Sequence, residues 1–497
     1  MFRRIIGLVM LVVLAVSCAA CSTSAPAEES PQTPSPADTA AVSPAASEET
    51  AASEPSAEST AGTEGSVYWF LEGSPDRLES ALEDVASLYT QQTGVPVEVR
   101  VASPDIYDEE LTSEMNRSDP PTIFDVNSGY HVDRWGMHAL DLTDTELAKE
   151  IDSTSYNMYD PDQKLVALGY AIDCFGIMVN PELLTQAGHS LEEIVDFPSL
   201  QAAAEDIHAR SAELGFDAFT TIDLVTDGDV YTAHLANIDY YYEQGLERWF
   251  ATPRTITGEY LGNYRNLYDL ARLNGPAADG TDREDPWEQF EAGTSVFCFG
   301  GSWLWDAIKD AVPDATMIPY YCGVSGDELA GLNDDAQNHW AVNADVSEAD
   351  QQASLDFMLW CVTDPAASRL LVDALGAMPY EHAQRSDNAF LAAADDYSKS
   401  GCYTMNWAFL CQPNPSVYRA ELRAALQSYN ENPTDETWQA FCQAFVDDWA
   451  TEYLIMYPNA NKTEDAVAEV TVPPRAEDAA AEADAAATEN AETSAAA

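Results

Sequence analysis

Basic residues are scarce in this chain of 497 residues. Lysine and arginine together number 22 against 85 aspartates and glutamates, which gives a formal net charge of -63 at pH 7. Binding to a phosphate backbone needs a basic footprint, so this composition argues against nucleic acid as a partner. A surface this acidic stays soluble by self-repulsion and attracts cations or basic partners.

Signatures of common catalytic and metal sites are missing as well. The sequence contains no Gly-x-Ser-x-Gly elbow, no Gly-x-x-x-x-Gly-Lys-Ser/Thr phosphate loop and no His-Glu-x-x-His motif. The cysteines of the folded part lack the short paired spacing of a zinc site, and the seven histidines are scattered. We therefore expect no enzyme activity, no cofactor and no metal, although 85 acidic residues leave room for a pair of glycosidase carboxylates.

The number of cysteines does not suit a fully paired disulfide framework. Seven follow the N-terminal region: Cys174, Cys298, Cys322, Cys361, Cys402, Cys411 and Cys442. An odd count leaves at least one thiol over. Disulfides are permitted outside the cell, and Cys402 with Cys411 is the pair to test first, because turn-forming residues 412–415 lie beside it. The sequence leaves open whether this disulfide forms.

The N-terminus carries an apolar run at residues 5–16, preceded by Arg3 and Arg4 and followed by small residues at 17–21. This is the pattern of a secretory signal, and the run is too short to span a bilayer stably. It resembles a bacterial lipoprotein signal (1–21), which implies lipidation of Cys21 or, alternatively, Cys18. We therefore expect a lipid-anchored protein on the extracellular face of the cell membrane, or on the periplasmic side where an outer membrane exists.

Low-complexity segments flank the folded part. Residues 22–64 are rich in Ala, Ser, Thr, Pro and Glu, and residues 463–497 are rich in Ala, Glu and Asp. Neither segment can bury enough apolar surface to offset the entropy lost on ordering. We therefore predict a disordered linker before the folded part and a disordered acidic tail after it.

Between these segments the hydrophobic pattern alternates between strands and helices. Strands are predicted at 67–71, 95–101 and 122–126, and helices at 76–93 and 107–116. Strand, helix, strand, helix, strand indicates a parallel α/β sheet. Two strand ends in this sheet offer polar or aromatic side chains, namely Glu72 and Ser74, and Asn127 and Tyr130.

A further strand end carries two tryptophans. Residues 296–299 suit a strand covered on both faces, Gly300 and Gly301 permit a sharp turn, and Ser302 can cap a helix that runs on to about residue 311. Open α/β sheets bind ligands at the carboxyl ends of their strands, so Trp303 is a candidate for a pocket wall. Trp305 lies about 200° further around the predicted helix and is expected to point into the core.

The order of motifs along residues 66–456 is similar to that of the family 1 extracellular solute-binding proteins of carbohydrate-type ABC importers. The motifs lie at residues 120–126, 132–143, 166–171, 175–188, 234–237, 293–303, 364–366 and 376–379. The resemblance implies a bilobed periplasmic-binding-protein-like α/β fold whose crossing strands lie near residues 169–174, 319 and 364. The implied N-terminal lobe comprises 66–170 and 320–364, and the implied C-terminal lobe comprises 171–319 and 365–462.

The same resemblance implies a monomeric lipoprotein that captures a mono- or oligosaccharide by hinge closure and delivers it to ABC permease subunits in the membrane. Sugar sites stack aromatic rings on the sugar and bind its hydroxyls with Asp, Asn and Glu. The ligand-binding residues expected here are Trp303, Tyr130, Trp340, Trp407, Glu72, Ser74, Asn127 and Asn237. A cage of carboxylates would instead favour a polyamine or a peptide.

Overall fold

The computed structural model describes residues 65–104, 106–245, 251–276 and 285–458, all within the unit formed by Thr60–Ala497. The predicted signal, linker and tail, including Cys18 and Cys21, lie outside these residues. In the described ranges, no helix combines the length and the apolar composition needed to cross a membrane.

One mixed sheet organises the described residues, with the strand order β2-β1-β3-β9-β5-β7-β6. The strands of this path are β1 (Val67–Glu72), β2 (Val97–Ala102), β3 (Ile123–Asp125), β5 (Leu165–Val179), β6 (Asp217–Phe219), β7 (Ser295–Gly301) and β9 (Ala330–Val342). Shorter strands join at its sides: β4 (Asn157–Tyr159) and β8 (Thr316–Ile318) pair with β5, and β10 (Tyr403–Met405) pairs with β9.

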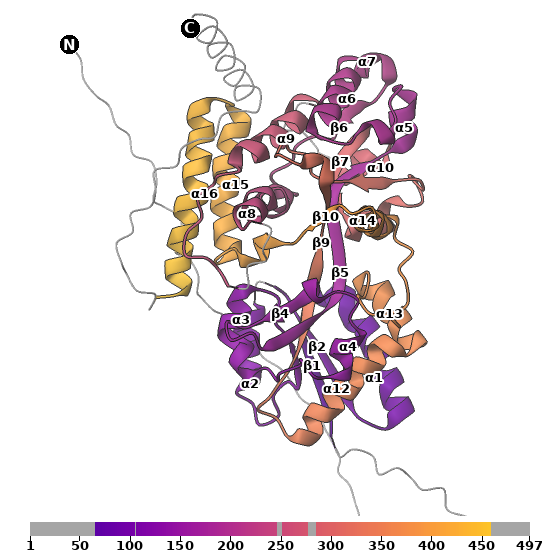
Figure 1. Cartoon of the computed structure of the whole chain (residues 1–497), viewed down its shortest axis with the longest axis vertical. Coiled ribbons are helices and arrows are strands. Elements are labelled where there is room, and N and C mark those ends of the chain that lie inside the picture. The colour runs from indigo at the N-terminus through magenta and orange to yellow at the C-terminus, as the bar shows by residue number, and fades with distance from the viewer. Residues whose placement is uncertain (1–64, 105, 246–250, 277–284, 459–497) are drawn as a thin grey trace, which may run out of the picture. The chain divides into compact units, whose positions relative to one another are not determined.

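Two long strands, β5 and β9, run side by side through both halves of the sheet (Figure 1). They pair antiparallel from Leu168 opposite Trp340 to Phe175 opposite Asn333. One end of β9 continues to β3, which lies parallel to β1 and β2. The other end of β5 continues to β7 and β8. The two halves of the sheet therefore form two lobes that share β5 and β9.

The first lobe packs helices on both faces of β1, β2 and β3. Its helices are α1 (Pro75–Thr93), α2 (Tyr107–Met115), α3 (Gly129–Trp135), α4 (Glu146–Glu150), α12 (Glu348–Thr363) and α13 (Pro365–Leu375). Trp69 and Phe70 alternate along β1, so Trp69 enters a core with Leu82 and Phe357, whereas Phe70 enters the opposite core with Tyr107. This alternation explains why a largely apolar strand serves two cores.

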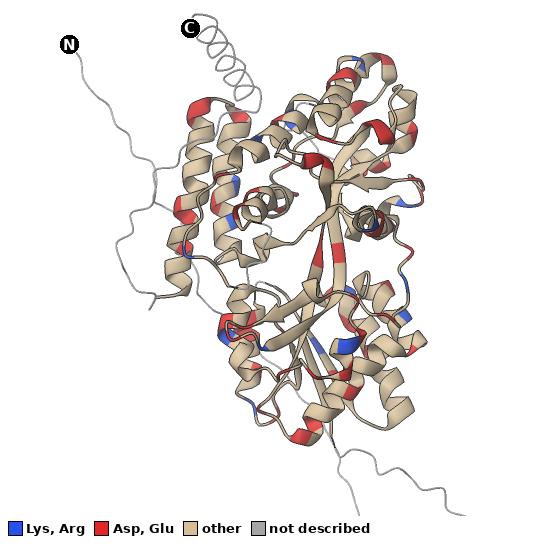
Figure 2. Cartoon of the chain, in the orientation of Figure 1, with Lys and Arg blue, Asp and Glu red and all other residues tan. Residues whose placement is uncertain are grey.

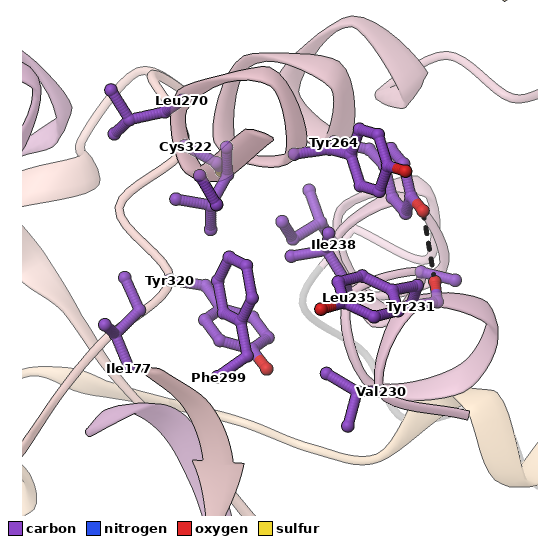
Figure 3. Close-up of a cluster of buried hydrophobic side chains, with 14 of the residues drawn as sticks. Ile177, Val230, Tyr231, Leu235, Ile238, Tyr264, Leu270, Phe299, Tyr320 and Cys322 are labelled. Atoms are coloured by element: carbon purple, nitrogen blue, oxygen red, sulfur yellow. Dashed lines mark hydrogen bonds between the residues drawn. The ribbon is translucent and has the colours of Figure 1, made fainter. Parts of the chain in front are cut away.

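The second lobe contains the larger apolar core, which includes many tyrosines and phenylalanines. Its helices are α5 (Pro181–Gln186), α6 (Phe197–Ala209), α7 (Ser211–Leu214), α8 (Asn237–Glu243), α9 (Leu261–Leu273), α10 (Pro286–Glu291), α11 (Trp305–Ile308), α14 (Ala389–Lys399), α15 (Pro415–Glu431) and α16 (Asp435–Met456). Figure 3 shows the part of this core around Phe299, Tyr320 and Leu235, where the Tyr264 hydroxyl donates to the Tyr231 carbonyl at 3.2 Å. The helices α15 and α16 lie side by side (Figure 1).

The expected elements differ from the structure in three places. The helix expected from Ser302 to about residue 311 is only a 3-10 turn (Ser302–Leu304) followed by the short α11. The crossing expected near residue 319 is made by β9, since β8 pairs with β5 inside the second lobe. The first lobe was expected to end at residue 364, but Leu371 and Tyr380, which follow this position, pack in the same core as Trp69.

The Cys402 thiol is free, so it forms no disulfide with Cys411.

Candidate functional site

The first wall of the candidate site is built at the carboxyl ends of β1 and β3. Glu72 ends β1, and Asn127 lies two residues beyond β3, just before Ser128 caps α3 by accepting from the His131 N–H at 3.1 Å. Asn127 donates from Nδ2 to Glu72 Oε2 at 2.8 Å and accepts from the His339 N–H at 2.8 Å. Because parallel strands end at one edge of the sheet, these two strand ends converge there.

A buried carboxyl, Asp125, lies behind this wall. It accepts from the Glu72 N–H at 3.0 Å, from Asn338 Nδ2 at 2.8 Å and from the Tyr170 hydroxyl at 3.1 Å. Burial raises the pKa of Asp125 to about 7, although these donors favour the ionised form. Asp125 therefore ties β1, β5 and β9 together beneath the site.

The opposite wall begins at the end of β7. Gly301 leaves room for the Trp303 ring, since a Cβ added to Gly301 would lie 2.2 Å from the ring. Trp303 is 39% exposed, and its ring centroid lies 5.1 Å from that of His234. Ser302 donates to Asp173 Oδ1 at 2.8 Å and accepts from the Cys174 N–H at 2.9 Å, which ties this turn to β5.

Three cavities lie along the cleft between the two walls. The largest, here called the arginine section, has a volume of about 720 Å³, the central section about 330 Å³ and the third section about 290 Å³. Glu72, Asn127, Phe409 and Arg419 line both of the first two sections. Asp173 and Trp303 line both the central and the third sections. The shared residues make the three sections neighbours along one groove, with Trp303 at a junction.

Aromatic rings gather at the central section. Trp407 and Phe409 stack with centroids 5.4 Å apart, and Phe409 also contacts His234 edge to face at 5.4 Å. Trp407 Nε1 and His234 Nδ1 are buried and have no hydrogen-bond partner among the described residues. Burial, followed by the charge of Arg419, lowers the pKa of His234 to about 3, so its ring is neutral at pH 7. The section thus combines apolar faces with unpaired polar groups.

Carboxyls also reach the central section. Burial raises the pKa of Asp173 to about 6, against the hydrogen bond from Ser302. Burial likewise raises the pKa of Glu72, although His131, Asn127 and Arg419 favour its ionised form. Both carboxyls line the groove. They are available as acceptors for hydroxyl groups of a ligand.

The structure brings five of the eight predicted residues to the groove. Trp303, Trp407, Asn127 and Glu72 line the central section, and Tyr130 lines the arginine section. Trp305, expected in the core, packs edge to face on Phe390 and also lines the third section.

The other three predicted residues lie outside these cavities. Ser74 is exposed at the start of α1, and Trp340 is buried in the first-lobe core with its ring stacked 4.4 Å from Tyr170. Asn237 is fully buried, donates to Asn333 Oδ1 at 2.9 Å and accepts from the Phe409 N–H at 3.2 Å. Asn237 therefore holds in place the segment that carries Trp407 and Phe409.

Several groove residues were not anticipated from the sequence. They are Asp173, His234, Asn338, Phe409 and Arg419. Asp173 is the acidic residue of the otherwise apolar segment Leu165–Val179, and such an isolated charge in a buried strand is a usable signal. Phe409 and Arg419 reach the groove only through the packing of α15 and the segment before it.

A family model described as bacterial extracellular solute-binding protein matches residues 84–384, which is more than half of the chain. The chain therefore belongs to this family, as the motif order predicted, and is a solute-binding protein. No curated protein matches the sequence.

Solved structures of low sequence identity share the fold. A family 1 extracellular solute-binding protein from Bifidobacterium longum subsp. infantis is 16% identical with a TM-score of 0.58, covering 78% of this chain and 100% of that chain. The bacterial solute receptor AcbH, described as preferring β-D-galactopyranose, is 12% identical with a TM-score of 0.61, covering 78% and 99%. RafE, known from Streptococcus pneumoniae, is 15% identical in its raffinose complex, with a TM-score of 0.55, covering 78% and 100%. The predicted bilobed α/β fold is confirmed.

Proposed function

We propose that this protein binds a carbohydrate in the groove between its lobes and delivers it to the membrane subunits of an ABC importer. In this proposal Trp303, Trp407 and Tyr130 supply aromatic faces, and Glu72 and Asn127 bind hydroxyls. Lipidation of Cys21 would hold the protein at the cell surface, with the linker between anchor and lobes. The protein acts by binding and closure rather than by catalysis.

The observation that carries the proposal is the composition of the central section. Trp303, Trp407 and Phe409 present rings next to the carboxyls of Glu72 and Asp173. Aromatic faces with a few fixed polar groups suit a sugar, which has apolar C–H faces and hydroxyl edges. The raffinose complex of RafE and the galactopyranose preference of AcbH, two proteins of this fold, add support.

A polyamine is the main rival ligand. A polyamine site needs carboxylates without competing cations, because its ligand is itself a cation. Arg419 lines the same central section as Glu72 and Asp173, and Arg423 lines the adjoining section. These guanidinium groups repel a polycation, so the groove favours the sugar.

Calorimetry with a panel of mono- and oligosaccharides, spermidine and short peptides tests the choice of ligand. We expect saturable binding of at least one saccharide and no binding of spermidine. Binding of spermidine or a peptide with no saccharide bound would refute the proposal. Hydrolysis of the bound saccharide, followed by chromatography, would instead establish the glycosidase alternative.

Anchoring is tested separately in cells. We expect the wild-type protein to fractionate with membranes and to incorporate a radiolabelled fatty acid, and the Cys21→Ser variant to lose both properties. Cys18→Ser serves as the matched control and is expected to retain them. The reverse result would move the lipid to Cys18.

A further inference from the structure

The arginine section contains two cations that share a single carboxylate. Arg419 and Arg423 lie one turn apart on α15, and both line this section. Arg419 Nη1 donates to Asp229 Oδ2 and Arg423 Nη2 donates to Asp229 Oδ1, each at 3.2 Å. Two positive charges against one negative charge leave a positive surplus on this wall.

This ratio is unusual for the molecule. Where two arginines share a carboxylate elsewhere, further carboxylates balance their charge: Arg100 and Arg117 share Glu114, and they also meet Glu110 and Asp119. Arg265 and Arg272 likewise share Asp269, and Arg265 also meets Asp435. In Figure 2 basic positions are sparse among the acidic ones, so additional carboxylate partners are easily supplied in this sequence. Like charges at positions i and i+4 of a helix repel each other, so Arg419 and Arg423 destabilise α15 unless a further negative charge lies beside them.

The Arg419 guanidinium is held in position by its surroundings. Arg419 Nε donates to Gln412 Oε1 at 2.6 Å, and Gln412 is itself buried and donates to the Thr232 carbonyl at 2.9 Å. The Arg419 guanidinium lies over the Phe409 ring at 5.7 Å. This support fixes the Arg419 group in advance of ligand binding, which lowers the entropy lost when a ligand binds.

Arg423 leaves a donor unused. It lies directly over Gly228, where a Cβ would come within 2.2 Å of its Nε. This Nε is buried without a hydrogen-bond partner among the described residues. A glycine at 228 therefore makes space for a guanidinium whose hydrogen-bonding capacity the protein does not fill.

The carboxyls of the opposite wall have other hydrogen-bond or ionic partners. Asp108 accepts from Trp135 Nε1 at 3.0 Å and lies 3.7 Å from His131 Nε2. Burial raises the pKa of Glu72, which binds Asn127. Neither carboxyl forms an ion pair with Arg419 or Arg423. The positive surplus on α15 is thus open to a negative group in the groove.

We infer that the arginine section binds an anionic substituent of the ligand, so that the solute is an acidic oligosaccharide carrying uronic acid carboxylates or sulfate esters. This inference rests on the proposed function and specifies its substrate class. Arg419 and Arg423 form charge-assisted hydrogen bonds to the anion, for which the planar guanidinium is well suited. The neutral part of the ligand extends over Trp407 and Trp303 in the neighbouring sections.

The test compares ligands that differ only in charge. Calorimetry with the purified protein measures trigalacturonate, its methyl ester, and sulfated and unsulfated forms of one further oligosaccharide. We expect the better anion to bind at least about tenfold more tightly than its neutral counterpart at low salt, with the advantage shrinking as salt rises. Preference for the carboxylate or for the sulfate identifies the source of the anion.

Variants connect this preference to the two arginines. Arg419→Gln combined with Arg423→Gln should abolish the affinity advantage of the anionic ligand over its neutral analogue. Arg369→Gln, at a half-exposed arginine on α13 that lines none of the three sections, is the matched control and should change neither affinity. If the double variant does not fold, the single variant Arg423→Gln is measured instead, because Arg423 is half-exposed and its replacement disturbs the fold less.

Each contrary result has a distinct meaning. Equal binding of neutral and anionic saccharides by the wild type would overturn this inference and leave the proposed function standing. Equal weakening of both ligand types in the double variant would also overturn it, since the pair would then serve cleft closure. Binding of no saccharide of either kind would refute the proposed function and this inference with it.

Discussion

Trp303 lies at the junction of the central and third sections, with its ring against the backbone of Gly301. A tryptophan that is 39% exposed beside a groove offers one face to a ligand. The same side chain in a core would be nearly inaccessible, as Trp340 is. Exposure and position together make Trp303 the first residue to test.

Trp303→Ala should weaken saccharide binding by a factor of about 3 to 10, since a stacked ring contributes about 0.5–1.5 kcal/mol beyond its buried area. Calorimetry with the best saccharide of the panel measures the loss. Trp360→Ala removes a half-buried tryptophan on α12, outside the groove, and is the control. Unchanged affinity in Trp303→Ala would remove this ring from the site.

Gly301→Ala tests the same ring through its neighbour. The added Cβ would lie 2.2 Å from the Trp303 ring, so the ring must leave its position. We expect a loss of affinity comparable to that of Trp303→Ala, with circular dichroism unchanged. Gly136→Ala is the control, because its Cβ would make only ordinary contact, 3.6 Å from Val166. Full affinity in Gly301→Ala would show that ring placement is not required.

At the scale of elements, the strands β3, β5 and β9 meet around the buried Asp125. The folded-state pKa of about 7 lies above the ordinary value of 3.8, so the folded protein holds a proton that the unfolded chain releases. The stabilisation from this group is complete below about pH 4 and is lost as the pH rises through about 7. Glu72, Tyr107 and Tyr170 are the titratable groups around it.

Asp125→Asn should remove this part of the pH dependence. The Glu72 N–H and Asn338 Nδ2 both donate to Oδ2 of Asp125, so the single side-chain oxygen of an asparagine can accept both hydrogen bonds. The NH2 group of the asparagine then lies where Oδ1 was and can donate to the Tyr170 hydroxyl. Urea unfolding at pH 5 and pH 8 measures the change, which we expect to be on the order of 2 kcal/mol smaller in the variant than in the wild type. Asp356→Asn, on the exposed face of α12, should match the wild type. An unaltered pH dependence in Asp125→Asn would contradict the assignment.

At the scale of the whole folded unit, the second lobe contacts the first lobe near the C-terminal end of α16. Most of α16 packs in the second-lobe core through Trp438, Phe445 and Trp449. Just beyond its end, the Tyr457 hydroxyl donates to Asp133 Oδ2 on α3 at 2.9 Å. The Tyr457 ring also meets Tyr130 edge to face at 6.1 Å. This contact links the lobes beside the arginine section, away from β5 and β9.

Tyr457→Phe should therefore shift the lobes toward a more open arrangement. Loss of one hydrogen bond costs about 0.5–1.5 kcal/mol, so we expect ligand affinity to fall about twofold to tenfold through a smaller closed population. Small-angle scattering of the ligand-free protein should show a larger radius of gyration. Tyr453→Phe, whose ring stacks on Tyr457 within the second lobe, is the control. Identical scattering and affinity in Tyr457→Phe would exclude a role in closure.

The sequence by itself determined the fold class and the strand ends of the first lobe. Hydrophobic periodicity is a local property, so it predicted the positions of β1, α1, β2, α2 and β3 close to those in the structure. The rule that ligands bind at the carboxyl ends of strands correctly selected Glu72, Asn127 and Trp303 as residues of the groove. The order of motifs identified the family that the model of residues 84–384 establishes.

Only the tertiary structure decided which aromatic and charged side chains share the groove. Trp340 and Trp407 look alike in sequence, yet strand alternation directs Trp340 into a core, whereas the loop before α15 carries Trp407 to the cavity. Arg419 and Arg423 meet Asp229 across about 190 residues of chain. No local pattern encodes such a contact, because it exists only once the packing of the second lobe sets α15 beside the segment that carries Asp229.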